Sequence, residues 1–235
     1  MGYLIYTEYM DKQFRIALFD LDGTLVDTEY QYTRFWERVG DELDIPVPNL
    51  AQVIKGRTLT SIYQTFIPSV AMRQQITRLL DQFEAQMQFN FYPGALDFLD
   101  DIRRNGVRCA VVTSSNRAKM QALRRKVPQF DTLFDQVLTA EDFSASKPDP
   151  SCYIFGAQVF GAPKQNCVVF EDAVNGLQAG VSSGIFTIGF PTTNPRSVIE
   201  PLCHHVCEGF QHLSYTEVNN LLISYWQQHS QRNCF

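Results

Sequence analysis

The chain has 235 residues, of which 45% are hydrophobic and 19% charged, and this composition is typical of a folded globular protein. Its length suffices for one sizeable core, or for a core with a small accessory domain. The formal net charge of −5 argues against a nucleic-acid-binding protein, which normally carries a basic face.

The sequence carries no sign of a membrane or export segment. No apolar run approaches the roughly 20 residues that a membrane span requires. The start of the chain also lacks the basic stretch and following apolar stretch of a secretory signal. We therefore expect a cytoplasmic protein with no membrane partner. Residues 1–9 are expected to form an N-terminal tail, with Met10 as an alternative start.

The first strand is predicted at residues 14–19, an apolar run that ends at Asp20-Leu21-Asp22-Gly23. In extended chain, Asp20 and Asp22 project to the same side. One such carboxylate can attack a phosphorus atom while the other handles the proton of the leaving group. A surface Asp-Gly turn has the same sequence signature, so this motif alone does not decide the chemistry.

Residues 28–91 contain no convincing strand. Apolar residues recur at helical spacing, first within residues 32–43 and again within residues 76–87. We predict that the segment is an all-helical cap domain, inserted on two linkers into a core made of residues 10–27 and 92–235. Extra helices packed on the main core are the alternative interpretation.

Short apolar runs alternate with helical patterns in the rest of the chain. Further strands are predicted at residues 107–112, 136–138, 167–170 and 185–188, with a weaker one at 204–207. Helices are predicted at residues 94–105, 117–127, 150–160 and 175–183. Repeated strand–helix units predict a parallel sheet covered on both faces. The expected fold class is α/β, a Rossmann-like parallel-sheet core with an inserted helical cap.

A cluster of hydroxyl-bearing residues follows the strand predicted at residues 107–112. Thr113 and Ser114 come directly after this strand, and a helix is predicted from Arg117. Hydroxyl groups together with the free N–H groups of a helix start can bind an anion such as phosphate. An ordinary helix cap explains the same residues equally well.

Two more polar clusters follow later strands. Lys147 lies in a loop stiffened by two prolines, where an ammonium could contact both a carboxylate and a phosphate. Glu171 and Asp172 end a buried apolar run, a costly position for two acids without a cation nearby. Because hard oxygen ligands suit Mg²⁺, the two acids indicate a magnesium site. A solvated lysine and a helix cap are the simpler alternatives.

Taken together, these clusters resemble the haloacid dehalogenase superfamily, in its phosphatase and β-phosphoglucomutase-like branch with a small helical cap. The resemblance runs from Phe14 to about Pro191. It rests on four motifs in the expected order, namely DLDGTLVDT (residues 20–28), VVTSSN (111–116), KPDP (147–150) and FEDAVNGLQAG (170–180).

The resemblance implies a role for each cluster. Asp20 would be the nucleophile that becomes an aspartyl-phosphate, and Asp22 the general acid and then the base that activates water. The phosphoryl group would be bound by Thr113, Ser114 and Lys147. The cofactor would be Mg²⁺, surrounded by Asp20, the Asp22 carbonyl, Glu171 and Asp172.

Three activities are compatible with this family pattern. The first is hydrolysis of a small phosphomonoester, sugar phosphates included. The second is a hexose-phosphate mutase, whose relatives carry a histidine where this chain has Tyr32 and an arginine where it has Leu59. The third is a non-catalytic phosphate-binding module, which would be expected to have lost at least one cluster. We expect the phosphatase, acting on a small phosphorylated metabolite; the sequence leaves protein partners undetermined.

Three residues are candidates for contacts with the rest of the substrate. Arg57 lies in a predicted cap loop, where a cation could face a phosphate, although a solvated surface residue is the alternative. Asn116 and Arg117 follow the hydroxyl cluster, and a plain helix start is the alternative for both.

Overall fold

A computed structural model describes residues 13–55 and 57–232 of the chain. The tail expected at residues 1–9 and the alternative start at Met10 lie outside the described residues. Among the helices of the described ranges, none is both long and apolar enough to cross a membrane.

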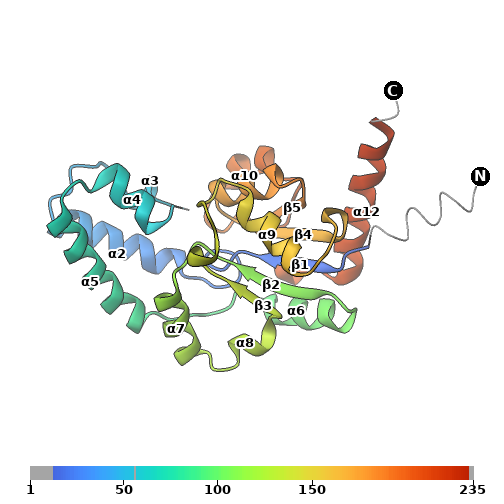
Figure 1. The fold of residues 1–235 in the computed structure, drawn as a ribbon, viewed down its shortest axis with the longest axis horizontal. Coiled ribbons are helices and arrows are strands. Elements are labelled where there is room, and N and C mark those ends of the chain that lie inside the picture. Colours follow the sequence, from blue (N-terminus) through green and yellow to red (C-terminus); the bar gives the residue numbers. More distant parts are fainter. Residues whose placement is uncertain (1–12, 56, 233–235) are drawn as a thin grey trace, which may run out of the picture.

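One sheet of six parallel strands forms the centre of the molecule, in the order β3-β2-β1-β4-β5-β6 (Figure 1). The strands are β1 (Ile16–Phe19), β2 (Arg108–Val112), β3 (Gln136–Leu138), β4 (Cys167–Glu171), β5 (Phe186–Gly189) and β6 (His205–Val206). The strand order reverses direction at β1, and ligands of such sheets bind beyond the carboxyl ends of the strands near this point. The predicted parallel α/β fold is confirmed.

Alternate residues of each strand feed two separate cores, as the period of two in a strand requires. On one face, Ala17 and Phe19 of β1 pack with apolar residues of α6 (Ala95–Arg104), α7 (Arg117–Lys126) and α12 (Tyr215–Arg232). On the other face, Ile16 and Leu18 pack with residues of α9 (Ser151–Val159) and α10 (Val174–Ser182). All four residues of β1 are buried, so the central strand is held from both sides.

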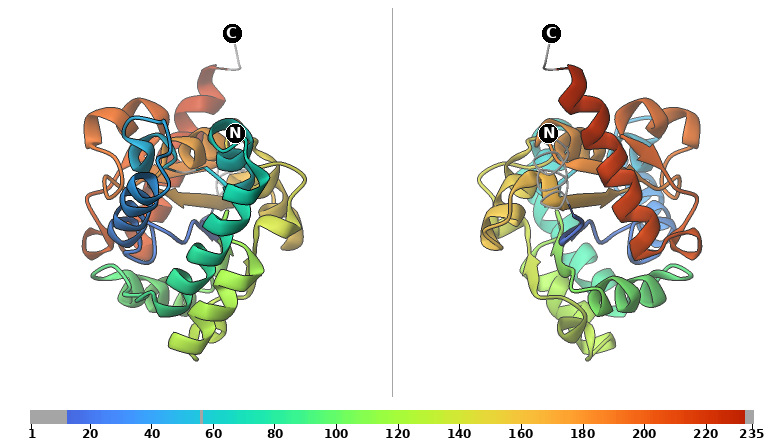
Figure 2. Two further views of the ribbon diagram at one scale, coloured as in Figure 1. Left: turned by 90° about the vertical axis from the view of Figure 1, so that its left-hand side faces the viewer. Right: turned by 90° about the vertical axis from the view of Figure 1, so that its right-hand side faces the viewer.

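Shorter helices complete the core. These are α8 (Phe130–Leu133), α11 (Arg196–Ile199) and the 3₁₀ turns η1 (Ala140–Asp142), η2 (Lys164–Asn166), η3 (Glu200–Leu202) and η4 (Phe210–His212). The long helix α12, which the strand–helix pattern did not predict, lies at the end of the molecule away from the helices of residues 29–86 (Figure 2).

The segment between β1 and β2 first forms a helical unit of its own. It contains α2 (Glu29–Glu42), α3 (Leu50–Val53), α4 (Leu59–Phe66) and α5 (Val70–Gln86). Their apolar faces enclose a separate core, in which Trp36, Ile62 and Ile76 are buried. The predicted inserted helical cap is therefore present. Within the described residues its helices are not interrupted by a strand. The exact limits of 28 and 91 stay a prediction.

The two linkers between core and cap lie side by side. Val26 and Phe91 form an antiparallel bridge. On either side of it, the Asp27 amide donates to the Asn90 carbonyl at 2.9 Å, and the Tyr92 amide donates to the Leu25 carbonyl at 2.9 Å. The chain therefore enters and leaves the cap at one place.

Candidate active site

The carboxylate of Asp20 lies directly beyond the buried end of β1, the central strand. Its Oδ1 accepts a hydrogen bond from Lys147 Nζ at 2.6 Å. The same ammonium donates to Glu171 Oε1 at 2.8 Å and to the Val112 carbonyl at 3.0 Å. The structure thus brings together residues from the ends of three adjacent strands and the loop after β3. Burial and the pair of carboxylates make this a strong charge-assisted contact.

Glu171 ends β4 with every oxygen engaged. Besides the lysine, Oε1 accepts from the Tyr153 hydroxyl at 3.0 Å, and Oε2 accepts from the amides of Asp172 and Ala173 at 2.8 and 3.0 Å. Gly176 of α10 makes room for this side chain, because a Cβ at that position would overlap the Glu171 carboxylate. The local sequence therefore fixes Glu171 in one orientation.

Asp172 differs from Glu171 in having a free oxygen. Its side chain is fully buried; Oδ1 accepts from the Thr24 hydroxyl at 2.5 Å, whereas Oδ2 has no hydrogen-bond partner in the described structure. Burial, with the repulsion of Glu171 and Asp20, raises the pKa of Asp172 well above its usual range. A buried acid in this state needs a cation or a proton.

A divalent cation fits this place. Within the described ranges, the group of acids that could hold a metal ion is Asp20, Glu171 and Asp172, with carboxylate oxygens all within 4.8 Å of one another. Oxygen donors of this kind suit Mg²⁺. The hydrogen bonds of Glu171 leave Asp20 and Asp172 as the better-placed direct ligands. Gly23 completes the cradle, because a Cβ there would overlap Asp172 Oδ2 and its φ is +85°.

Magnesium is expected to stabilise the fold more at about pH 8 than at about pH 5.5. Burial raises the pKa of Asp20 from 3.8 to about 7, against the opposing charge of Lys147. Without a cation, a raised folded-state pKa stabilises the fold below about pH 4, and this contribution is lost as pH rises through 7. Mg²⁺ binds the deprotonated acids and should offset that loss.

The measurement is the Tm with Mg²⁺ minus the Tm with a chelator, at both pH values. The variant Asp172→Asn is the control, since it removes the negative charge of the ligand with the free oxygen and should lose most of the difference. An equal magnesium effect at the two pH values would contradict the assignment.

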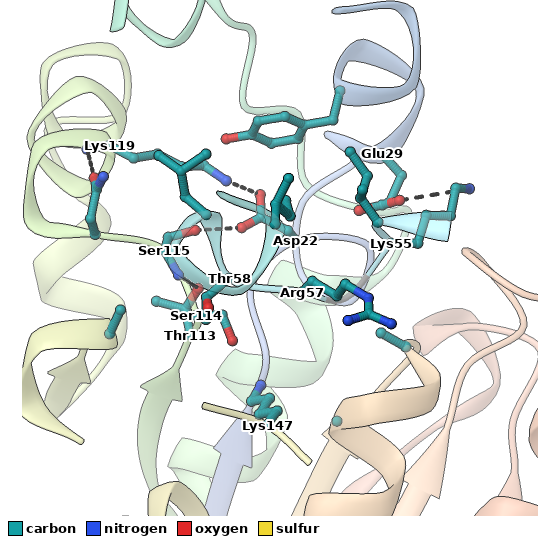
Figure 3. A pocket seen from close by; sticks show the side chains of 18 of the residues that line it. Asp22, Glu29, Lys55, Arg57, Thr58, Thr113, Ser114, Ser115, Lys119 and Lys147 are labelled. Carbon is teal, nitrogen blue, oxygen red and sulfur yellow. Dashed lines mark hydrogen bonds and ion pairs between the residues drawn. The ribbon is translucent and has the colours of Figure 1, made fainter. Parts of the chain in front are cut away.

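Asp22 occupies a different environment from Asp20. Its Oδ1 accepts from Lys119 Nζ at 2.5 Å and from the Thr28 hydroxyl, and its Oδ2 accepts from Ser115 Oγ at 2.8 Å (Figure 3). Although burial acts to raise it, the Lys119 ammonium and the two hydroxyl groups hold the pKa of Asp22 below its usual range. The two aspartates of the motif therefore have opposite pKa shifts.

Lys119, Tyr32 and Glu84 join Asp22 to the cap, and the sequence reading missed this link. The ammonium of Lys119, from core helix α7, lies 4.4 Å from the centre of the Tyr32 ring in cap helix α2. The Tyr32 hydroxyl donates to Glu84 Oε1 of α5 at 2.7 Å. All three side chains are largely removed from water, so the cap contributes directly to the surroundings of Asp22.

The hydroxyl cluster after β2 lies beside these acids. Thr113 is buried, and its Oγ1 accepts from the Ser115 amide at 3.0 Å. Thr113, Ser114 and Asn116 line one cavity with Asp20 and Lys147. Asn116 also caps α7, because its Oδ1 accepts from the Lys119 amide at 2.8 Å. The helix-cap interpretation thus holds for Asn116 without removing it from the cavity.

Of the two arginines proposed for substrate contacts, one lines this cavity. Arg57 does so, with its Nε donating to the Val53 carbonyl at 3.2 Å. Arg117 is not among the lining residues; its exposed guanidinium pairs with Asp142 at 3.1 Å. This ion pair on η1 favours the helix-start interpretation of Arg117.

The cavity has a volume of about 410 Å³ and lies between core and cap. The core supplies the acids, hydroxyl groups and lysines at its base, while α2, α3, α4 and α5 supply its upper wall. Figure 3 shows Lys119 and Ser115 both pointing to Asp22, with Glu29 and Lys55 paired on the cap side. Such a cavity can enclose a small ligand whose phosphate lies near Asp20.

Comparison with known proteins identifies the family. A family model described as haloacid dehalogenase-like hydrolase matches residues 14–184. The chain belongs to this family. Among its curated members, hexitol phosphatase A of Escherichia coli K12 is 30% identical over 186 residues, or 76% of this chain and 85% of that protein.

Two further relatives extend the comparison. Protein SUPPRESSOR OF QUENCHING 1, chloroplastic, of Arabidopsis thaliana is 27% identical over 194 residues; the match covers 78% of this chain and 18% of that protein. The crystal structure of β-phosphoglucomutase from Clostridium difficile matches with a TM-score of 0.75 and 20% identity, over 90% of this chain and 98% of that one. The latter likeness shows the shared haloacid dehalogenase-like fold.

Proposed function

We propose that this haloacid dehalogenase-like hydrolase is a magnesium-dependent phosphatase that cleaves a small phosphomonoester through an aspartyl-phosphate on Asp20. The observation that carries the proposal is the buried contact of Asp20 with Lys147, beside the unpartnered oxygen of Asp172. A carboxylate that must attack a phosphate needs this concentration of positive charge around it. The phosphatase relative supports the same class of reaction.

In the first step, a carboxylate oxygen of Asp20 attacks phosphorus and the bond from phosphorus to the ester oxygen breaks. The leaving oxygen takes a proton from Asp22, whose carboxyl lies in the same cavity. The negative charge of the bound phosphate beside it raises the pKa of Asp22 from its lowered value in the free enzyme, so that Asp22 can hold this proton. Lys147, Thr113 and Ser114 hold the phosphoryl oxygens in line with Asp20. The first product is a neutral alcohol, and Asp20 carries the phosphoryl group.

In the second step, water attacks the phosphoryl group and gives a proton to the Asp22 carboxylate. The bond from phosphorus to Asp20 then breaks, which restores both aspartates and releases inorganic phosphate. The cap excludes bulk water during the first step, because its helices form the upper wall of the cavity.

Asp20, Asp172 and the backbone carbonyl of Asp22 would hold Mg²⁺, with Glu171 fixing Lys147 and the amides beside them. When bound, the cation would offset the negative charge shared by the phosphate and the Asp20 carboxylate.

Lys119→Met is expected to lower kcat by about 10²-fold, because general acid–base catalysis is worth about 10²–10⁴ and the variant disturbs the group that provides it. The substitution removes an ammonium that is 2.5 Å from Asp22 and leaves the hydroxyl groups of Thr28 and Ser115 as the remaining partners of this carboxylate. Steady-state kinetics across pH measure the effect. The pKa of Asp22 should rise and the pH–rate profile should move with it; an unchanged kcat and profile would contradict the role. Lys119→Arg, which keeps the charge, is the matched control.

The mutase remains the alternative, and the surroundings of Tyr32 weigh against it. Tyr32 occupies the position of the mutase histidine, but its hydroxyl is bound to Glu84 and its ring to Lys119. Burial and Glu84 raise the pKa of this hydroxyl well above its usual range. The position therefore offers no group that exchanges protons near neutral pH.

The test is release of inorganic phosphate from a panel of phosphorylated metabolites and from p-nitrophenyl phosphate, with Mg²⁺ and with a chelator. We expect turnover with Mg²⁺ alone. No turnover of any ester would support the non-catalytic module. For the mutase, the substrate is β-glucose 1-phosphate with a trace of the bisphosphate. Formation of glucose 6-phosphate in place of free phosphate would show that the protein is a mutase and not a phosphatase.

A further inference from the structure

Each lysine that lines the cavity within the described ranges already has a carboxylate partner. Lys147 contacts Asp20 and Glu171, and Lys119 contacts Asp22. Lys55, in the loop after α3, lies 3.7 Å from Glu29 in the first turn of α2. The Lys55–Glu29 pair is only about one-fifth exposed on either side, so solvent screens it incompletely. Lys147 is assigned to the phosphoryl group itself, so among the described residues no unpaired lysine is left to meet a second acidic group of a substrate.

Among the described residues, Arg57 is the remaining cation of the cavity wall, and its contacts hold it at the surface of the cap. Its Nε donates to the Val53 carbonyl, and its guanidinium lies 5.4 Å from the centre of the Phe66 ring. The residue is exposed, which lets water screen its charge.

Beyond the phosphoryl end, acids outnumber bases in the cavity wall. Glu29, Glu84 and Glu141 face the same space as Lys55 and Arg57, whereas Asp22 and Lys119 pair with each other at the phosphoryl end. Glu84 is buried with its Oε1 on the Tyr32 hydroxyl. A second anionic group on the substrate would meet this negative wall, and uncompensated like charges are strongly unfavourable away from water.

Neutral hydrogen-bonding groups share the remaining wall with apolar side chains of the cap, such as Trp36 and Leu80. The hydroxyl and amide side chains of Thr33, Thr58, Thr60, Ser114 and Asn116 line it, together with the Glu29 carboxylate, which can accept from a hydroxyl group. An uncharged leaving group that carries several hydroxyl groups can form hydrogen bonds both with these neutral side chains and with the Glu29 carboxylate.

We infer that the Glu29–Lys55 pair selects substrates by charge, so that the enzyme hydrolyses monophosphates of uncharged polyols or sugars and discriminates against leaving groups that carry a carboxylate or second phosphate. This inference rests on the proposed phosphatase function. Glu29 acts by neutralising Lys55, which would otherwise be available to an anionic leaving group. It is a specificity residue for the reaction at Asp20.

The test compares two substrates of matched size, glucitol 6-phosphate and 6-phosphogluconate, which differ in a terminal hydroxymethyl or carboxylate group. The readout is the ratio of their kcat/KM values. In wild type, glucitol 6-phosphate should be favoured by about tenfold or more, the ratio that about 1.4 kcal/mol of charge repulsion gives. Glu29→Gln frees Lys55 and should reduce the ratio by about tenfold.

Lys55→Met leaves Glu29 unpaired and should move the ratio the opposite way, further towards glucitol 6-phosphate. The double variant Glu29→Gln/Lys55→Met removes both charges and should return the ratio to near the wild-type value, which completes a double-mutant cycle. Glu141→Gln is the matched control: it removes an acid of the same wall without freeing a lysine, so the ratio should change by less than about twofold.

The outcomes separate this inference from the proposed function. Suppose that the wild type hydrolyses p-nitrophenyl phosphate, so that the proposed phosphatase function holds. The charge selection is then wrong if the wild type prefers 6-phosphogluconate or hydrolyses neither six-carbon ester. It is also wrong if the ratio of kcat/KM values is unchanged in both single variants. A preference for 6-phosphogluconate that Arg57→Gln abolishes would assign Arg57 the role of binding the second anion. If wild type hydrolyses no phosphomonoester, the proposed function fails, and the inference fails with it.

Discussion

Asp20→Asn is expected to lower the rate of phosphate release by about 10⁴-fold or more, since a carboxamide cannot form the covalent phosphoryl intermediate and losses of this order follow removal of a nucleophile. The fold should survive, because asparagine has nearly the same size and its carbonyl oxygen can still accept from Lys147. Burial raises the pKa of Asp20 to about 7, so ionising this carboxyl at neutral pH opposes folding. The metal-free variant should therefore unfold at the wild-type temperature or above it.

Steady-state phosphate release and thermal unfolding in the presence of a chelator measure these two effects together. Ser114→Ala is the matched control, because it alters the same cavity without touching the nucleophile, and we expect a loss of about tenfold for one hydrogen bond. Asp20→Asn retaining more than about one hundredth of wild-type activity would show that another group attacks the phosphate.

Lys147→Met is expected to reduce both stability and activity. The ammonium is 5% exposed and serves two buried carboxylates, Asp20 and Glu171, at 2.6 and 2.8 Å. Removing one partner of a buried ion pair costs about 3–5 kcal/mol, because the charges left behind are uncompensated. Loss of a donor to the phosphoryl oxygens should lower kcat by about 10²–10³-fold as well. Urea unfolding and steady-state kinetics measure the two losses.

The cause of the stability loss can be tested with the double variant Lys147→Met/Asp20→Asn. Because this variant neutralises one of the stranded acids, its unfolding free energy should exceed that of Lys147→Met alone. Mg²⁺ should also recover part of the loss, since a divalent cation replaces the missing positive charge. A loss below about 1 kcal/mol in Lys147→Met would indicate that the acids take up protons or water instead.

The sheet and its acidic edge were predictable because each feature has a local signature. The strands are short apolar runs, and Asp20, Lys147, Glu171 and Asp172 each follow a predicted strand. In a parallel sheet such positions meet at one edge, so chain order alone indicated the cluster that the structure shows. The weak strand expected at residues 204–207 is present as the two residues of β6.

The upper half of the site was less predictable, because its contacts join distant parts of the chain. Lys119 stands in a helix whose last turn carries three basic residues, so it reads as a solvated charge, yet Asp22, Tyr32 and Glu84 enclose it. Lys55 and Glu29 likewise become a pair only when α2 and α3 pack together. No periodicity or motif encodes such contacts. The spacing did indicate α2, α5 and α7, but not the short helix α3 that precedes Lys55.

The antiparallel bridge of Val26 and Phe91 has a consequence for how such a protein can diversify. Because the polypeptide leaves the sheet and rejoins it at neighbouring residues, a loop of a few residues would suffice to close the core without the intervening helices. An insertion whose two ends already touch can be lengthened, trimmed or exchanged without shifting a strand. The residues that choose a substrate and the residues that break its phosphate ester are thus free to change at different rates.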